Sequence, residues 1–95
     1  MKLISNRALR EFATRYPASE MPLQDWRRVV EKFGFSTWSD LKRVFRSVDK
    51  VGELAIFDIG GNKYRIAAYA RFQKQRICVK AVMTHKEYDK GAWKP

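Results

Sequence analysis

The stretch Lys63-Tyr64-Arg65-Ile66-Ala67-Ala68-Tyr69-Ala70-Arg71-Phe72 decides the fold, because its residues alternate with a period of two. One side of this alternation carries Tyr64, Ile66, Ala68, Ala70 and Phe72. The opposite side carries Lys63, Arg65, Ala67, Tyr69 and Arg71. Successive side chains of a β-strand point to opposite faces. The pattern therefore predicts a strand with one face on a core and a second face that is cationic and aromatic.

Two further strands are predicted beside this one. Leu54–Ile59 is rich in apolar residues, and Gly60-Gly61-Asn62 after it is a strong turn signal. Residues 73–75 form a polar turn before a third apolar run over residues 77–83. Strands joined by such short connections run antiparallel, since parallel pairing needs a long crossover. The second half of the chain is therefore predicted to be an antiparallel meander, with its second sheet face open to water.

The first half of the chain has helical periodicity instead. After a short opening strand over residues 2–4, Ser5 is the predicted N-cap of a helix that must end at Pro17. A second helix is expected from around Pro22, with Gly34 as its left-handed stop. The residues expected to face the core are Leu9, Phe12, Ala13 and Tyr16 in the first helix and Leu23, Trp26, Val30 and Phe33 in the second.

A third helical segment follows, and together these elements define the fold class. Thr37 with Asp40 resembles a capping pair for this segment. Its expected inward residues are Trp38, Leu41, Val44 and Phe45. Helices followed by a meander predict an α+β fold in which N-terminal helices pack on one face of a small antiparallel sheet. The 95 residues predict one domain over residues 1–95.

Composition excludes several classes of protein. A single cysteine, Cys78, and a single histidine, His85, exclude a disulfide framework and a Cys/His zinc cluster, so neither a metal nor a cofactor is expected. No stretch approaches 18 apolar residues, and the N-terminus lacks the apolar core of a signal peptide. We therefore expect a cytoplasmic protein with no membrane partner.

The charge distribution indicates a polyanionic partner. Twenty Lys and Arg against ten Asp and Glu leave a net charge of +10. Seven of the basic residues lie between Asp58 and Glu87 with no carboxylate among them: Lys63, Arg65, Arg71, Lys74, Arg76, Lys80 and Lys86. Such cations can simply protect an exposed strand edge. Here, however, three of them share a strand face with Tyr69, on whose ring a base can stack. This favours a surface that contacts RNA or DNA, with Lys63, Tyr69, Arg71, Lys74 and Lys80 as its binding residues.

The candidate chemistry lies in residues 84–90. No Walker loop, Ser-His-Asp arrangement, paired carboxylates or acidic two-metal cluster is indicated, so cleavage of a nucleic acid would be metal-free. Cleavage of RNA by its own 2′-hydroxyl needs a base, an acid for the leaving 5′-oxygen, and cations at the phosphate. His85 can serve as base or acid, while Tyr88 can stack or donate a hydrogen bond. Continued strand parity places His85 with Ile77, Val79, Ala81 and Met83 on the core side. A bulge or strand end near Thr84 is therefore needed to turn His85 towards Arg65.

Two motifs resemble the HigB family of toxins from bacterial toxin–antitoxin modules. The first is the Gly60-Gly61-Asn62-Lys63-Tyr64-Arg65 turn, and the second is the Thr84-His85-Lys86-Glu87-Tyr88-Asp89 ending. Residues 3–5 and 41–45 also match, so the resemblance spans residue 2 to about residue 90. The family belongs to the RelE-like superfamily, which implies N-terminal helices packed on an antiparallel sheet.

The resemblance also implies a function. It implies an mRNA interferase, a ribosome-dependent endoribonuclease that cuts translated mRNA and arrests growth. Its partner would be a HigA-type helix-turn-helix antitoxin, with operator DNA bound only through the toxin–antitoxin complex. On that pattern Arg65 binds the scissile phosphate, and His85, Lys86 and Tyr88 lie at the cleavage site. Two alternatives stay open, a non-catalytic RNA- or DNA-binding module and an inactive toxin homologue kept as an interaction protein.

Overall fold

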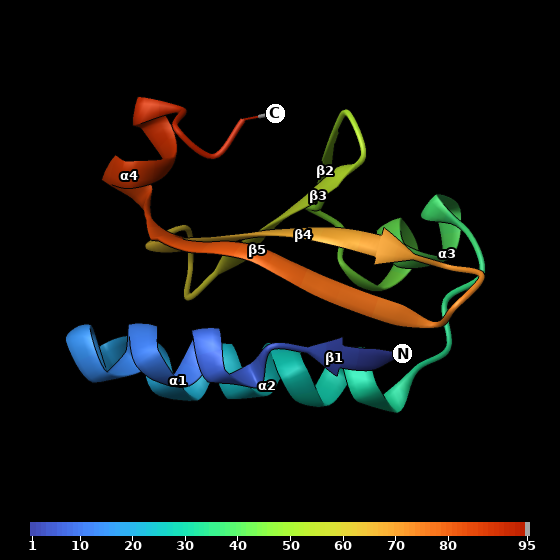
Figure 1. The fold of residues 1–95 in the computed structure, drawn as a ribbon, viewed down its shortest axis with the longest axis horizontal. Helices are drawn as coiled ribbons and strands as arrows, with labels where there is room; N and C mark the ends of the chain where they lie inside the picture. The colour runs from blue at the N-terminus through green and yellow to red at the C-terminus, as the bar shows by residue number, and fades with distance from the viewer. Residues whose placement is uncertain (95) are drawn as a thin grey trace.

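A five-stranded sheet with the order β1-β5-β4-β3-β2 forms the centre of the computed structural model, which describes residues 1–94 (Figure 1). The strands are β1 (Lys2–Ile4), β2 (Asp49–Val51), β3 (Leu54–Ile59), β4 (Tyr64–Arg71) and β5 (Arg76–Thr84). The helices are α1 (Asn6–Arg15), the 3-10 turn η1 (Pro17–Ser19), α2 (Glu20–Lys32), α3 (Trp38–Val44) and α4 (His85–Lys90). Within residues 1–94 no helix has the length and apolar character that a membrane crossing requires.

The predicted meander is confirmed, and two short strands extend it. β3, β4 and β5 pair antiparallel in chain order. β1 lies parallel to β5, and β2 lies antiparallel to β3 at the other edge. The α+β class is therefore confirmed. The β2 strand was not predicted, because two of its three residues, Asp49 and Lys50, are charged and exposed and give no apolar signal.

Helices α1 and α2 cover one face of the sheet, as Figure 1 shows. The strand residues buried beneath the helices are Ala55, Phe57, Ile59, Ile66, Ala68 and Ile77. Phe57 lies at the middle of this core, where its ring meets Trp26 edge-on at 5.1 Å and Phe45 at 5.0 Å. The predicted alternation of β4 is confirmed, because Ile66 and Ala68 lie in this core while Ala67 lies in a second cluster on the opposite face.

One extra residue in β5 changes which face its side chains occupy. Ala67 pairs with Ala81, but the next residue, Ala68, pairs with Val79, so that Lys80 forms a bulge. A bulge leaves the extra residue unpaired and reverses the alternation beyond it. Val79 accordingly packs towards the helices, whereas Ala81 packs into the cluster on the second face. The expectation that Ala81 and Met83 face the helix-side core is therefore wrong.

The predicted helix boundaries need three corrections. Ser5 is not a side-chain cap; it takes a left-handed conformation (φ 82°), and its carbonyl oxygen accepts from Ala8 N–H. Helix α2 begins at Glu20 and ends at Lys32, with Phe33 extended and Gly34 outside the left-handed region. Phe33 is consequently 41% exposed, and Phe35, at 2%, takes the expected core position.

Further along the chain one burial expectation fails, whereas a helix cap and a turn are confirmed. Val44, at the end of α3, is 41% exposed rather than buried. The predicted cap of α3 is confirmed, since the Thr37 hydroxyl accepts from Asp40 N–H at 3.2 Å. The predicted turn at residues 60–62 is also confirmed, because all three residues adopt positive φ.

The second face of the sheet is not left open. Residues 85–90, for which no helix was predicted, form α4, which stands on the opposite side of the sheet from α1 and α2 (Figure 1). A capping box begins this helix, in which Thr84 and Glu87 each bond the other's backbone N–H. Trp93, which follows α4, is buried with β-strand residues of the second face. The expectation of a fully solvated second face is therefore wrong.

The packing of Phe57 predicts a large loss of stability when its ring is removed. We expect Phe57→Ala to lower the free energy of unfolding by about 3–5 kcal/mol, because the substitution leaves a cavity under two aromatic rings. The matched control is Phe33→Ala, in which a partly exposed ring is removed, with an expected loss below about 1 kcal/mol. Urea unfolding of both variants checks the difference, and equal losses would contradict this core.

Candidate functional site

The candidate site lies on the second face of the sheet, below α4. A small apolar cluster supports it, formed by Leu54, Ile56, Ala67, Met83 and Trp93, with Val51, Tyr69, Ala81 and Tyr88 packed against it. Met83 pairs with Arg65 in the antiparallel ladder, so the two residues share this face. The bulge in β5 and the end of that strand at Thr84 thus bring the start of α4 to the face that carries Arg65.

Arg65 is held firmly in place although it carries a charge. It is 8% exposed, and its Nε lies 2.8 Å from Oδ1 of Asp58, the residue that pairs with it on β3. Its Nη1 donates hydrogen bonds to the carbonyl oxygens of Asn62 at 2.9 Å and Tyr64 at 3.2 Å. A buried charge is tolerated when it is paired and hydrogen-bonded in this way. The turn at residues 60–62 therefore supplies an acceptor that orients the guanidinium.

The ring of Tyr88 covers Arg65, and a second ring stacks on Tyr88. The centre of its guanidinium lies 5.1 Å from the centroid of the Tyr88 ring, which is a cation–π contact. On Tyr88 lies the indole of Trp93, stacked at 5.0 Å with an angle of 9° between the rings. Trp93 Nε1 donates to the Tyr88 carbonyl oxygen at 2.8 Å, and Lys80 Nζ donates to the Trp93 carbonyl oxygen at 2.8 Å. The segment after α4 thus fixes Tyr88 over Arg65.

His85 and Lys86 lie in the first turn of α4, the helix that also carries Tyr88. The backbone N–H of His85 donates to the carbonyl oxygen of Lys63 at 3.0 Å, which ties the start of the helix to the turn before β4. The imidazole Nε2 lies 3.3 Å from Oδ2 of Asp89, one helical turn further on. The side chain of His85 is 53% exposed, and Lys86 is exposed as well. Both side chains are therefore accessible to a ligand from solvent.

The structure separates the remaining predicted binding residues. Tyr69 and Arg71 form a pair on the second face, with the guanidinium 4.9 Å from the ring centroid. Arg71 and Lys74 line a hollow of about 450 Å³ at the β4–β5 turn. Lys63 is exposed in the turn before β4, near the start of α4. Lys80 differs, because it is the bulged residue and its ammonium group holds the Trp93 carbonyl oxygen.

Two residues of the site were missed from the sequence. Asp58 is the ion-pair partner of Arg65, and the short turn at residues 60–62 already implied that the two lie opposite each other on neighbouring strands. Trp93 carried no such signal, since only the folded chain brings it onto Tyr88. The sequence did contain a signal for helix α4, because Thr84-x-x-Glu87 is the spacing of a capping box. Within residues 1–94 no group of three or more His, Cys, Asp or Glu side chains is placed to hold a metal ion.

The Asp58–Arg65 pair predicts a specific stability effect. We expect Asp58→Asn to lower the free energy of unfolding by about 1–3 kcal/mol, because it leaves a nearly buried guanidinium without its counter-charge. The matched control is Asp25→Asn, which removes a solvent-exposed pair with Arg28 and should cost less than about 0.5 kcal/mol. Chemical denaturation measures both. Similar losses would mean that the buried pair contributes no more than a surface one.

Comparison with known proteins shows the family of this chain. The HigB toxin family, described as the RelE-like toxic component of a toxin–antitoxin system, matches residues 19–91. The mRNA interferase toxin HigB of Escherichia coli K12 is 37% identical over 92 residues, which cover 94% of this chain and 88% of that protein. The mRNA interferase HigB of Escherichia coli O6:H1 is 33% identical over 93 residues, covering 95% and 90%. The chain therefore belongs to the HigB family of RelE-like toxins of toxin–antitoxin systems.

Proposed function

We propose that this chain is an mRNA interferase, a toxin that cleaves mRNA through the 2′-hydroxyl group of the ribose. Two relatives carry the name mRNA interferase, and the chain covers 88–90% of their lengths. The observation that carries the proposal is the position of α4. Its first turn presents the exposed His85 and Lys86, and its Tyr88 ring lies over the guanidinium of Arg65, which the fold has already oriented.

The proposed chemistry needs only side chains of this site. The ribose 2′-oxygen attacks the adjacent phosphorus as a base removes its proton, and the bond from phosphorus to the 5′-oxygen breaks as that oxygen gains a proton. The products are a 2′,3′-cyclic phosphate and a free 5′-hydroxyl. His85 carries out proton transfer, while Arg65 and Lys86 stabilise the negative charge that develops on the phosphate. Tyr88 orients or stacks on the nucleotide.

The contacts of Arg65 support a role at the phosphate. Its Nε faces Asp58 and its Nη1 faces two carbonyl oxygens, so that Nη2 is the nitrogen left for a phosphate oxygen. A guanidinium fixed before the substrate arrives requires little reorganisation during the reaction. The same contacts make Arg65 part of the fold, because its removal leaves the Asp58 carboxylate unpaired.

The partners follow from the family and from the charge of the chain. A toxin of this family has an antitoxin, and we propose that here it is a HigA-type helix-turn-helix protein that connects the pair to operator DNA. We further propose that cleavage takes place on translating ribosomes in the cytoplasm. The net charge of +10 supports both partners, since acidic antitoxin residues and rRNA phosphates are each attracted to such a surface.

Substitutions in α4 test the catalytic assignment. We expect His85→Ala and Lys86→Ala to lower the rate of mRNA cleavage by about 10²–10⁴-fold and about 10²–10³-fold, the usual losses for a proton-transfer group and a charge-stabilising group. Lys90→Ala is the matched control, because it removes an exposed lysine from the end of the same helix. Each variant is expressed in cells, growth is recorded, and transcript 5′ ends are mapped with and without ribosome engagement.

Several outcomes of this experiment decide between the functions. Growth arrest by both the His85→Ala and the Lys86→Ala variants would remove the proposed site. A wild-type chain that binds RNA without new 5′ ends would instead be a non-catalytic binding module. Capture of an antitoxin without cleavage would identify an inactive homologue. For Arg65, an Arg65→Lys variant that stays folded and binds the antitoxin separates loss of catalysis from loss of structure.

A further inference from the structure

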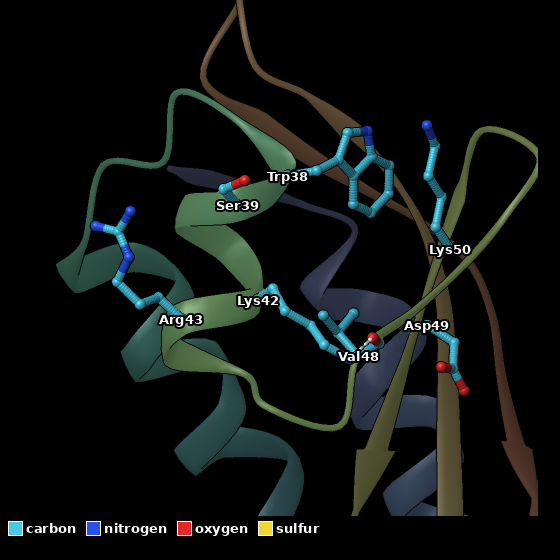
Figure 2. Close-up of a pocket in the computed structure, with 7 residues that line it drawn as sticks. All are labelled: Trp38, Ser39, Lys42, Arg43, Val48, Asp49 and Lys50. Atoms are coloured by element: carbon cyan, nitrogen blue, oxygen red, sulfur yellow. Dashed lines mark hydrogen bonds between the residues drawn. The ribbon is translucent and has the colours of Figure 1, made fainter.

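A hollow away from the candidate catalytic site combines cations with an aromatic ring. It has a volume of about 520 Å³ and lies between α3 and the start of β2, as Figure 2 shows. Its lining residues are Trp38, Ser39, Lys42, Arg43, Val48, Asp49 and Lys50. We call it the α3–β2 pocket. The family resemblance in the sequence assigned no role to any of its side chains.

The cations of this pocket outnumber its acids. Lys42, Arg43 and Lys50 face a single carboxylate in the lining, that of Asp49. The ammonium group of Lys42 is fixed in place, because it donates to the carbonyl oxygen of Val48 at 2.9 Å (Figure 2). The side chain of Arg43 is 78% exposed, and its nearest acid, Asp40, is 3.8 Å away. Figure 2 shows the Arg43 side chain directed away from Trp38 and Lys50, so Arg43 lies at the rim of the pocket.

Trp38 gives the pocket a surface on which a base can stack. The ring packs edge-on against Phe72 at 5.5 Å, which anchors it to the core. Nζ of Lys50 lies 5.2 Å from the centroid of the indole. A ligand can displace a lysine from an aromatic ring, since a cation–π contact at an exposed site contributes only about 0.5–1 kcal/mol. A base can therefore stack on the ring while Lys50 moves to a phosphate.

The pocket continues along the edge of the sheet towards the C-terminal end of β4. A smaller hollow of about 270 Å³ shares Trp38 and Lys50 with it and extends to Arg71, with Glu53 as the acidic residue in its lining. Arg71 in turn lies over the ring of Tyr69 on β4. From Arg65 to Arg71 the strand spans roughly 20 Å, at about 3.3 Å per residue. Arg71 therefore lines a hollow shared with Trp38, which packs on the helix-side core, and pairs with Tyr69 of the second face.

We propose that the α3–β2 pocket binds one nucleotide of a single-stranded RNA segment, with its base on Trp38 and its phosphate at Lys50. This inference rests on the proposed action on RNA and adds a contact outside the cleavage site. Single-stranded RNA fits better than a duplex, because only an unstacked base can lie on a protein ring. It also fits better than an acidic peptide, which would use the cations but leave the indole face without a partner.

Lysines that lie over aromatic rings provide a matched test. Lys50→Ala removes the cation over Trp38, whereas Lys32→Ala removes a comparable cation, 5.7 Å from the ring centroid of Phe33, at the end of α2. The probe is a labelled 2′-O-methyl oligoribonucleotide, which has no free 2′-hydroxyl and cannot be cut by the proposed reaction. Fluorescence anisotropy at several salt concentrations measures its binding to the purified chain.

We expect Lys50→Ala to bind the oligomer about 5- to 10-fold more weakly and to lower the slope of log affinity against log salt by about 0.7, the value for one lost phosphate contact on a single strand. Lys32→Ala should stay within about twofold of the wild type and keep its slope. Trp38→Leu should weaken binding by about tenfold through loss of stacking. If Trp38→Leu fails to fold, the comparison of Lys50→Ala with Lys32→Ala still tests the proposal, because Lys50 is exposed.

A second binding experiment, with vacant ribosomes, distinguishes mRNA from rRNA as the RNA that occupies the pocket. Weaker binding of the Lys50→Ala variant to the oligomer, with unchanged ribosome binding, assigns the pocket to mRNA. Weaker binding to vacant ribosomes assigns it to exposed rRNA. Unchanged affinity in both arms, or a loss confined to antitoxin binding, overturns the proposal. Failure of the catalytic assignment is distinct, because it appears as growth arrest by the His85→Ala and Lys86→Ala variants.

Discussion

β5 carries one residue more than β4 between the pairs Ala67–Ala81 and Ala68–Val79, and the geometry of the site depends on that extra residue. Without the bulge, Met83 would point towards α1 and α2. The chain would then leave the sheet on the helix side, away from Arg65. With the bulge, Met83 lies beside Arg65 on the second face, and α4 begins there. Lys80 is the bulged residue and has no paired residue on β4, and its ammonium group reaches the Trp93 carbonyl oxygen.

Arg65 serves the fold and the proposed reaction with the same contacts. Asp58 compensates its charge, the carbonyl oxygens of the turn orient it, and Tyr88 covers it. Burial of a charge is expensive unless such partners are present. A guanidinium held in this way is oriented before any phosphate arrives, which is the condition for electrostatic stabilisation at low cost. A stable buried pair and a pre-oriented phosphate ligand are thus two consequences of one arrangement.

Cation–ring pairs occur on both faces of the sheet. Arg65 lies over Tyr88, Arg71 over Tyr69 and Lys50 over Trp38. Each pair offers a charge for a phosphate and a ring for a base, which are the two features by which proteins bind single-stranded nucleic acids. The seven basic residues between Asp58 and Glu87 had indicated such a surface. Lys50 and Trp38 lie outside that segment, on the helix side of the sheet, and only folding brings them together.

The sequence alone determined the α+β order, the three-stranded meander and the family, because alternation in β4, the Gly60-Gly61-Asn62 turn and the Thr84–Asp89 ending are local patterns. It also identified Arg65, His85, Lys86 and Tyr88 as candidates from residue type and resemblance. Only the tertiary structure decided that Asp58 and Trp93 complete the group, and that Lys80 supports Trp93. The physical reason is that a one-residue bulge reverses strand parity without a local sequence signal, and that the stacking of Tyr88 on Trp93 depends on how the end of the chain folds back onto the sheet.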